Sequence, residues 1–260
     1  MGYHRFVAKL SDSSLRCVAR VYHFTNAVTT GFWLGFMSDR SLEMADDLHY
    51  KRSKKYFDEK YIQSGLFRWE KAAIEKYFSG AKKILLIAAG SARETFALSR
   101  MGLEVDSYEC NEALMEYGNK LLQEKGFEER IKYLQRNTVP GELTKYEGII
   151  IGWGAYSHIR GRSKRLSFLK DLRPFLKTEA PLMISFLLTV ERTRQDRIVK
   201  RVSNGLRIFR RKSKTETGDL LHSGFVHYFT EEEIKNELKE AGYRITGYNS
   251  VDYGCIIATV

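Results

Sequence analysis

Short apolar runs alternate with amphipathic stretches from about residue 80 to the end of the sequence. Strands are predicted at residues 83–88, 104–109, 131–135, 147–152 and 181–188, and the first and the last two of them are apolar runs. Helices are expected between them, at residues 92–101, 112–125 and 163–175. Apolar strands that alternate with helices are typical of a parallel sheet covered on both faces. We therefore expect an α/β fold with a doubly wound, mostly parallel sheet.

The C-terminal part adds a helix, a strand pair and an insertion. Residues 230–233 form a capping box that opens a helix, and Gly242 ends that helix. Residues 244–250 and 254–260 predict a terminal antiparallel strand pair. Residues 189–229 are an insertion that begins with a basic helical stretch. Because segments beside the carboxyl ends of the strands face the ligand crevice, we expect this insertion to shape an acceptor site.

The N-terminal third lacks this alternation, so we divide the chain into residues 1–80 and a domain at 81–260. Residues 42–63 are charged with spaced aromatics, and residues 66–78 have the spacing of an amphipathic helix. We expect a helical cap or lid that closes over the pocket opposite the insertion. The stretch at 21–37 is apolar but interrupted by polar residues, and a spanning helix needs about 20 mostly apolar residues. We interpret it as a buried or lid element, with no membrane span.

A turn of small residues follows the first predicted strand. Gly90 lies in this turn, and the next strand ends with the acid Glu109, 19 positions later. A small-residue turn with an acid about 20 residues on is how an α/β sheet binds a nucleotide ribose. Ala92 and Thr95 stand where a dinucleotide fingerprint has further glycines, and no P-loop lysine is present. A ligand without phosphates at the turn therefore fits better.

With these residues the chain resembles the class I S-adenosylmethionine-dependent methyltransferases, a family with a Rossmann-like fold. Further landmarks follow in order. Residues 146–153 resemble the fourth strand of that fold, residues 172–186 its turn into the fifth strand, and residues 227–243 the helix before the last strands. The likeness covers roughly residues 80–260. It implies S-adenosyl-L-methionine as cofactor and methyl transfer as activity.

The resemblance also implies which residues contact the cofactor. Glu109 would accept hydrogen bonds from the ribose, and Cys110 would lie beside the adenine with Asn137 across from it. The expected cofactor-binding residues are Ala88, Ala89, Gly90, Ala92, Glu109, Cys110, Asn137, Thr138, Gly152 and Trp153. The family often has an acid at the positions of Ala88 and Asn137, and a second glycine at that of Ala92.

The segment after the fourth strand contains the candidates for catalysis. Methyl transfer from a sulfonium is an in-line displacement, so the protein aligns the reactants, excludes water and sometimes removes a proton. His158 and Tyr156 are expected to orient or deprotonate the acceptor, and His227 is an alternative base. A structural role is the alternative for each. No Asn-Pro-Pro-Tyr motif and no Asp/Asn metal cluster follows the fourth strand, which argues against base-amine methylation and against metal-dependent chemistry.

The net charge of +11 leaves the acceptor class open. Ten Lys and Arg residues but one acid, Asp196, lie between residues 192 and 214. An RNA methyltransferase that uses this basic stretch is therefore an alternative, although stacking aromatics are almost absent from it. We favour methyl transfer to oxygen or nitrogen of a small molecule or peptide. A non-catalytic adenosyl-binding partner subunit is a further alternative.

Compartment follows from the cysteines and the N-terminus. Cys17, Cys110 and Cys255 are far apart and have neither disulfide-framework nor metal-site spacing. The sequence opens without the apolar segment of a secretory signal. These features predict a cytoplasmic protein. They indicate no oligomeric state.

Overall fold

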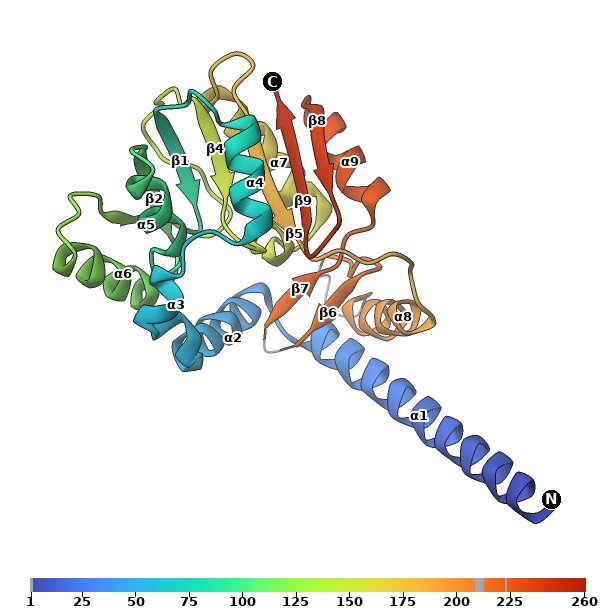
Figure 1. Cartoon of the computed structure of the whole chain (residues 1–260). Helices are drawn as coiled ribbons and strands as arrows, with labels where there is room; N and C mark the ends of the chain where they lie inside the picture. Colours follow the sequence, from blue (N-terminus) through green and yellow to red (C-terminus); the bar gives the residue numbers. More distant parts are fainter. Residues whose placement is uncertain (1, 209–212, 223) are drawn as a thin grey trace.

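The computed structural model describes residues 2–208, 213–222 and 224–260 (Figure 1). Its main sheet comprises β1 (Lys83–Ile87), β2 (Glu104–Glu109), β3 (Ile131–Tyr133), β4 (Gly148–Ile151), β5 (Leu182–Phe186), β8 (Arg244–Asn249) and β9 (Gly254–Thr259). The strand order is β3-β2-β1-β4-β5-β9-β8. Strands β1 to β5 pair in parallel, and β9 is antiparallel to both β5 and β8. The predicted mostly parallel sheet with an antiparallel C-terminal pair is confirmed.

Helices cover both faces of this sheet. One face carries α4 (Arg68–Tyr77), α5 (Arg93–Arg100) and α6 (Glu112–Glu124), and the other carries α7 (Arg162–Leu172), the short η3 (Arg173–Phe175) and α9 (Glu231–Glu240). Successive strand residues point to opposite faces, so Ile84 and Leu86 enter the first core while Leu85 and Ile87 enter the second. The sheet is therefore doubly wound, and its parallel strands end at a common edge.

The N-terminal segment is helical, as expected, but its first helix lies elsewhere than predicted. It comprises α1 (Gly2–Phe36), α2 (Asp39–Arg52), η1 (Lys54–Phe57) and α3 (Glu59–Gln63). Figure 1 shows α1 extending away from the body of the molecule. The expectation of a buried or lid element at residues 21–37 is wrong for most of that stretch, since only Ala27, Gly31, Leu34 and Gly35 are buried there. Among the described helices, none is long and apolar enough to cross a membrane.

The insertion forms α8 (Arg194–Ile208) and a small hairpin of β6 (Asp219–Leu221) and β7 (Phe225–His227). Helix α8 packs against the last turns of α1, where a Cβ on Gly31 would lie 2.8 Å from the Val199 carbonyl oxygen. The basic helix therefore braces α1 instead of covering the pocket. The hairpin was not predicted, and basic residues 210–212 lie outside the described part of the chain.

Candidate functional site

A cavity opens at the carboxyl ends of β1, β2 and β4, the edge at which α/β sheets bind ligands. Residues 87–91 after β1 and residues 108–111 after β2 form one wall, and residues 134–138 after β3 extend it. The opposite wall comes from α2, η1 and α3, which contribute Leu42, Asp46, Tyr50, Tyr56 and Tyr61. Residues 39–63, and not α1, therefore cover the site.

The turn after β1 has an unusual backbone. Gly90 has a φ of +56°, and a Cβ there would meet open space. Ala88 and Ala92 have φ values of 62° and 82°, in the left-handed region that costs an L-residue about 1–3 kcal/mol. A Cβ at Gly152 would lie 2.1 Å from the Ala88 carbonyl oxygen, so the residue that follows β4 has to be a glycine where the chain passes this turn. Strain of this kind concentrates at ligand sites.

Glu109 is held at the cavity by backbone donors. Its Oε2 accepts a hydrogen bond from the Gly90 amide at 2.8 Å, and its Oε1 accepts from the amides of Cys110 at 2.9 Å and Asn111 at 2.8 Å. The side chain is 6% exposed and lines the cavity. Burial and the neighbouring Glu109 charge raise the pKa of the Cys110 thiol, which therefore stays neutral. A fixed carboxylate thus stands beside the small-residue turn.

A buried ion-pair cluster places a second carboxylate at the same turn. Arg93 donates to both oxygens of Glu70, at 2.7 Å each, and to Oε1 of Glu94 at 2.7 Å. Burial disfavours the charge on Arg93, but the two acids outweigh it and raise its pKa. Arg93 and Glu94 both line the cavity. Sequence analysis missed this cluster because its partners come from α4 and α5, which only the fold brings together.

Acidic residues tie α2 across the site. Asp47 accepts a hydrogen bond from Arg136 at 2.6 Å, and Asp39 accepts one from Arg160 at 2.7 Å. Arg136 follows β3 and Arg160 precedes α7, so the two pairs anchor α2 to two different sides of the cavity. Between them Asp46 is buried, which raises its pKa to about 6. The cover is therefore fastened by charge pairs in addition to the buried side chains of Leu42 and Ile62.

His158 lines the cavity and contacts the cover. It lies at the end of η2 (Ala155–His158), and its Nδ1 is 2.8 Å from the Phe225 carbonyl oxygen. Because a carbonyl only accepts, Nδ1 carries the proton and Nε2 accepts a hydrogen bond from the Tyr50 hydroxyl at 3.2 Å. Burial lowers the pKa of His158 to about 4, so the ring is neutral at pH 7. An ordinary histidine pKa does not apply to this residue.

A second cavity adjoins the first on the side of β5 and β9. Five residues line both cavities: Asp46, Tyr50, Tyr56, Trp153 and His158. The second is completed by Gly154, Leu187, Val226 and Tyr253 among others, whereas Glu109 lines only the first. The hydrogen-bonded pair Tyr50–His158 thus stands on the boundary between two adjoining spaces.

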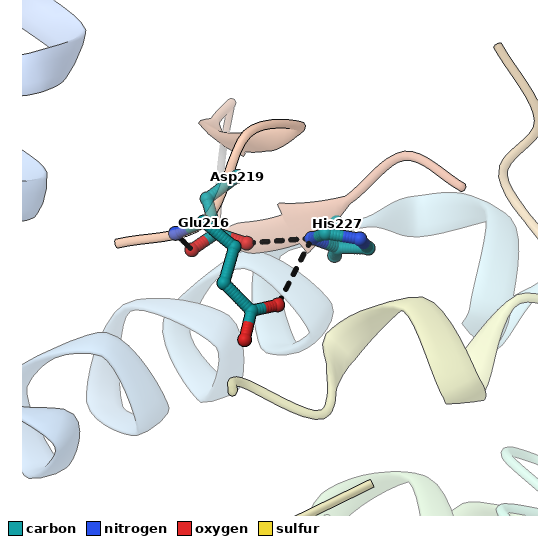
Figure 2. Close-up of side chains that lie close together, drawn as sticks. All are labelled: Glu216, Asp219 and His227. Carbon is teal, nitrogen blue, oxygen red and sulfur yellow. Dashed lines mark hydrogen bonds and ion pairs between the residues drawn. The ribbon is translucent and has the colours of Figure 1, made fainter. Parts of the chain in front are cut away.

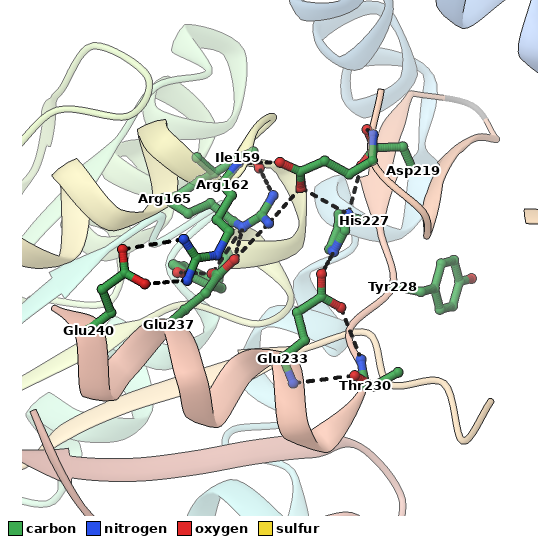
Figure 3. Close-up of polar contacts among 12 residues, drawn as sticks. Ile159, Arg162, Arg165, Asp219, His227, Tyr228, Thr230, Glu233, Glu237 and Glu240 are labelled. Carbon is green, nitrogen blue, oxygen red and sulfur yellow. Dashed lines mark hydrogen bonds and ion pairs between the residues drawn. The ribbon is translucent and has the colours of Figure 1, made fainter. Parts of the chain in front are cut away.

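Tyr156 is not a site residue, in contrast to the prediction. It is 0% exposed, and its hydroxyl donates to Glu237 at 2.8 Å. Arg165 donates to the same carboxylate at 2.7 Å (Figure 3). Burial and the Glu237 charge raise the pKa of Tyr156 well above its usual value. The tyrosine therefore anchors η2 to α9 within the core.

His227, the alternative base, is also buried away from both cavities. Its Nδ1 donates to Asp219 at 2.7 Å and its Nε2 to Glu233 at 3.2 Å (Figures 2 and 3). Burial opposes a charge on this ring, but the two carboxylates outweigh it and raise the pKa of His227. Glu216 stands 3.9 Å away and pairs with Arg165 at 2.7 Å. These charged groups pair and hydrogen-bond with one another, so we assign them the structural role of holding the β6–β7 hairpin in place.

Most predicted cofactor residues gather around the first cavity. Eight line it: Ala88, Ala89, Gly90, Glu109, Cys110, Asn137, Thr138 and Trp153. Ala92 and Gly152 are buried just outside the lining and shape the turn from behind. Sequence analysis missed the tyrosines of the cover as site residues, although the spacing of Tyr50, Tyr56 and Tyr61 was a visible signal.

Comparisons with known proteins identify the fold. No protein-family model matches the sequence, and no curated protein matches it significantly. A solved Pyrococcus horikoshii protein matches with a TM-score of 0.62 at 14% identity, over 82% of this chain and 98% of that one. Two S-adenosylmethionine-dependent methyltransferases match similarly. The one from Methanosarcina mazei has a TM-score of 0.56 at 14% identity, over 75% of this chain and 98% of that one. The one from Aquifex aeolicus has a TM-score of 0.55 at 19% identity, over 81% of this chain and 98% of that one. The chain has the class I methyltransferase fold.

Proposed function

We propose that this protein is an S-adenosylmethionine-dependent methyltransferase that modifies oxygen or nitrogen of a small molecule or peptide. The observation that carries the proposal is Glu109, held by three backbone amides at the end of β2 and opposite the left-handed turn at Gly90. The fold and the methyltransferases that share it support the same conclusion.

The residues of the first cavity fit this cofactor. Glu109 would accept hydrogen bonds from the ribose hydroxyls, since each of its oxygens can accept more than the amide bonds it already has. Asn137 and Thr138 would flank the adenine, and open space at Gly90 allows close approach of the methionine portion. Glu94 would attract the methionine ammonium group. When bound, the cofactor supplies an electrophilic methyl group on a positive sulfur.

Aromatic side chains exclude water from the same region. Tyr50, Tyr56, Tyr61 and Trp153 line the cavity between the turn and the boundary with the second cavity. The Lys55 ammonium lies 4.4 Å from the ring centroid of Tyr61 and 4.6 Å from that of Trp153, so these two rings already hold a positive charge. We assign the second cavity to the methyl acceptor, because it shares five lining residues with the first, and an acceptor held there would meet the methyl group where the two cavities adjoin.

Proton removal is assigned to the Tyr50–His158 pair. A neutral His158 accepts through Nε2, so Tyr50 can pass its hydroxyl proton to the ring while it takes one from the acceptor. The low pKa of His158, about 4, makes it a weak base whose activity depends on position. Positioning by the two cavities then supplies the larger part of the rate.

In this proposal residues 39–63 form the lid over the site. The lid is therefore shorter than the segment 1–80 that was expected to act as the N-terminal cap. Opening requires separating Asp47 from Arg136 and Asp39 from Arg160. Charge pairs at partly exposed positions contribute about 0.2–1 kcal/mol each, so the burial of Leu42 and Ile62, at about 1.5–3 kcal/mol each, sets most of the cost of moving the cover. We retain the cytoplasm as its expected compartment; the three cysteines are free.

The test is transfer of a labelled methyl group. The protein is incubated with methyl-labelled S-adenosylmethionine and a cell extract, and the products are separated into small-molecule, peptide and RNA fractions. Label is expected in one of the first two fractions and absent with Tyr50→Phe/His158→Ala protein. Label in RNA would support the RNA alternative instead. Cofactor binding without transfer to any fraction would favour a non-catalytic subunit.

A further inference from the structure

Helix α1 exposes a large apolar surface. Ten of its large apolar side chains are 43% to 66% exposed: Val7, Leu10, Leu15, Val18, Val21, Tyr22, Phe24, Phe32, Trp33 and Phe36. Every residue from 7 to 26 is exposed, and Figure 1 shows this part of α1 extending beyond α8. Apolar patches of this size on soluble folds mark interaction sites.

The apolar and basic residues of α1 lie on opposite sides of the helix. At about 100° per residue, the apolar side chains of residues 7–24 spread over about half of the circumference. Lys9, Arg16 and Arg20 lie on the other half, and Asp12 is the one acid of the α1 sequence. A helix that pairs with one other helix needs a narrower stripe of apolar positions. The width of the apolar half favours a broad, flat partner.

We propose that α1 binds the surface of an anionic lipid bilayer, with its apolar half in the headgroup region. A wide apolar face with aromatics and a basic polar face are the features of interfacial helices. The exposed Arg194, Arg197 and Arg201 of α8 add positive charge beside α1. With a net charge of +11, the whole chain complements acidic headgroups. The helix lies on the bilayer and does not cross it, in agreement with its composition.

Vesicle flotation of the full chain tests this proposal. Phosphatidylcholine vesicles are compared with vesicles that also contain phosphatidylglycerol, at low and high salt. We expect the protein to float with the acidic vesicles and less so at high salt. Leu10→Gln/Val21→Gln should reduce partitioning about tenfold or more, because two apolar contacts are lost. The matched control is Leu143→Gln, a residue 64% exposed in a loop, which should float like the parent protein.

Three results would overturn the proposal. The first is flotation that is equal on both kinds of vesicle, and the second is flotation that is unchanged in the α1 double variant. The third is a dimer in sedimentation equilibrium that the double variant dissociates, with no vesicle binding, which would assign the apolar face to a second copy of the chain. Titration with S-adenosylhomocysteine checks that each variant keeps its folded catalytic domain, and its outcome is independent of lipid binding.

Discussion

His158 owes its chemistry to two neighbours and to its burial. The Phe225 carbonyl fixes its tautomer, Tyr50 occupies Nε2, and burial lowers its pKa to about 4. We expect His158→Ala to lower turnover by about 10²–10⁴-fold with little change in cofactor affinity. Between pH 6 and 8 the rate should not rise through deprotonation of His158, because the ring is already neutral. A rate that rises with pH near 6.5 in the parent protein but not in the variant would show that the ring is solvated during turnover.

The same shift makes a stability prediction with a definite sign. An unfolded His158 takes up a proton near pH 6.5, whereas the folded one resists until about pH 4. The unfolded state therefore binds more protons in this window, and stability falls as the pH falls from 6.5 toward 4. The loss from this group is at most about 3 kcal/mol. Denaturant unfolding of wild type and His158→Gln at pH 7 and pH 4.5 measures it; equal pH dependence would refute the assignment.

Which residues lie near the cavity could be predicted better than the direction in which their side chains point. Glu109 ends β2, and Gly90 lies in the short turn that follows β1, so the sheet itself dictates their position. Tyr156 and His158 are two residues apart in a 3₁₀ turn, and one enters the core while the other reaches the cavity. No apolar pattern distinguishes them, because the partner of each, Glu237 for one and Tyr50 for the other, comes from a distant segment.

At the scale of elements, the contact between α1 and α8 depends on small residues. A Cβ at Gly31 would lie 2.8 Å from the Val199 carbonyl oxygen, whereas one at Gly205 of α8 would meet nothing within 4 Å. Gly31→Ala should therefore cost about 1–3 kcal/mol, and Gly205→Ala should be neutral or stabilise by about 0.4–1 kcal/mol. Thermal melts of the two variants make the comparison. Similar shifts in both would mean that α1 does not pack on α8 in solution.

The strands were predictable, and the insertion was not. Strand β1 follows the apolar run from Ile84 to Ile87, because these four residues are buried within a parallel sheet. The β6–β7 hairpin is too short to produce a periodic signal, and its Asp219–His227 hydrogen bond joins two polar residues paired across the hairpin, which no apolar pattern marks. Helix α1 was misjudged for a related reason, since an apolar stretch indicates burial only when the fold supplies a cover.

At the scale of the whole molecule, the described part of the basic stretch at residues 192–214 lies away from both cavities. Among the described residues of the basic stretch, from 192 to 208 and at 214, none lines either cavity. We therefore predict weak, non-specific RNA binding that disappears by about 0.15 M salt. Fluorescence anisotropy with a short labelled RNA measures it, and Arg197→Glu should weaken it at low salt. Tight binding to a defined RNA at physiological salt would instead support the RNA methyltransferase alternative.

The central claim is that the cavity beside Gly90 binds S-adenosylmethionine through Glu109. The most direct measurement is calorimetric titration of the whole protein with S-adenosylhomocysteine and, in parallel, with NAD. We predict a micromolar site for S-adenosylhomocysteine and none for NAD. Glu109→Ala should weaken the former by about 1–3 kcal/mol, the scale of a charge-assisted hydrogen bond. Glu104→Ala, at the exposed opposite end of β2, should leave it unchanged. Heat from NAD but not from S-adenosylhomocysteine, or equal affinity in the two variants, would contradict the account.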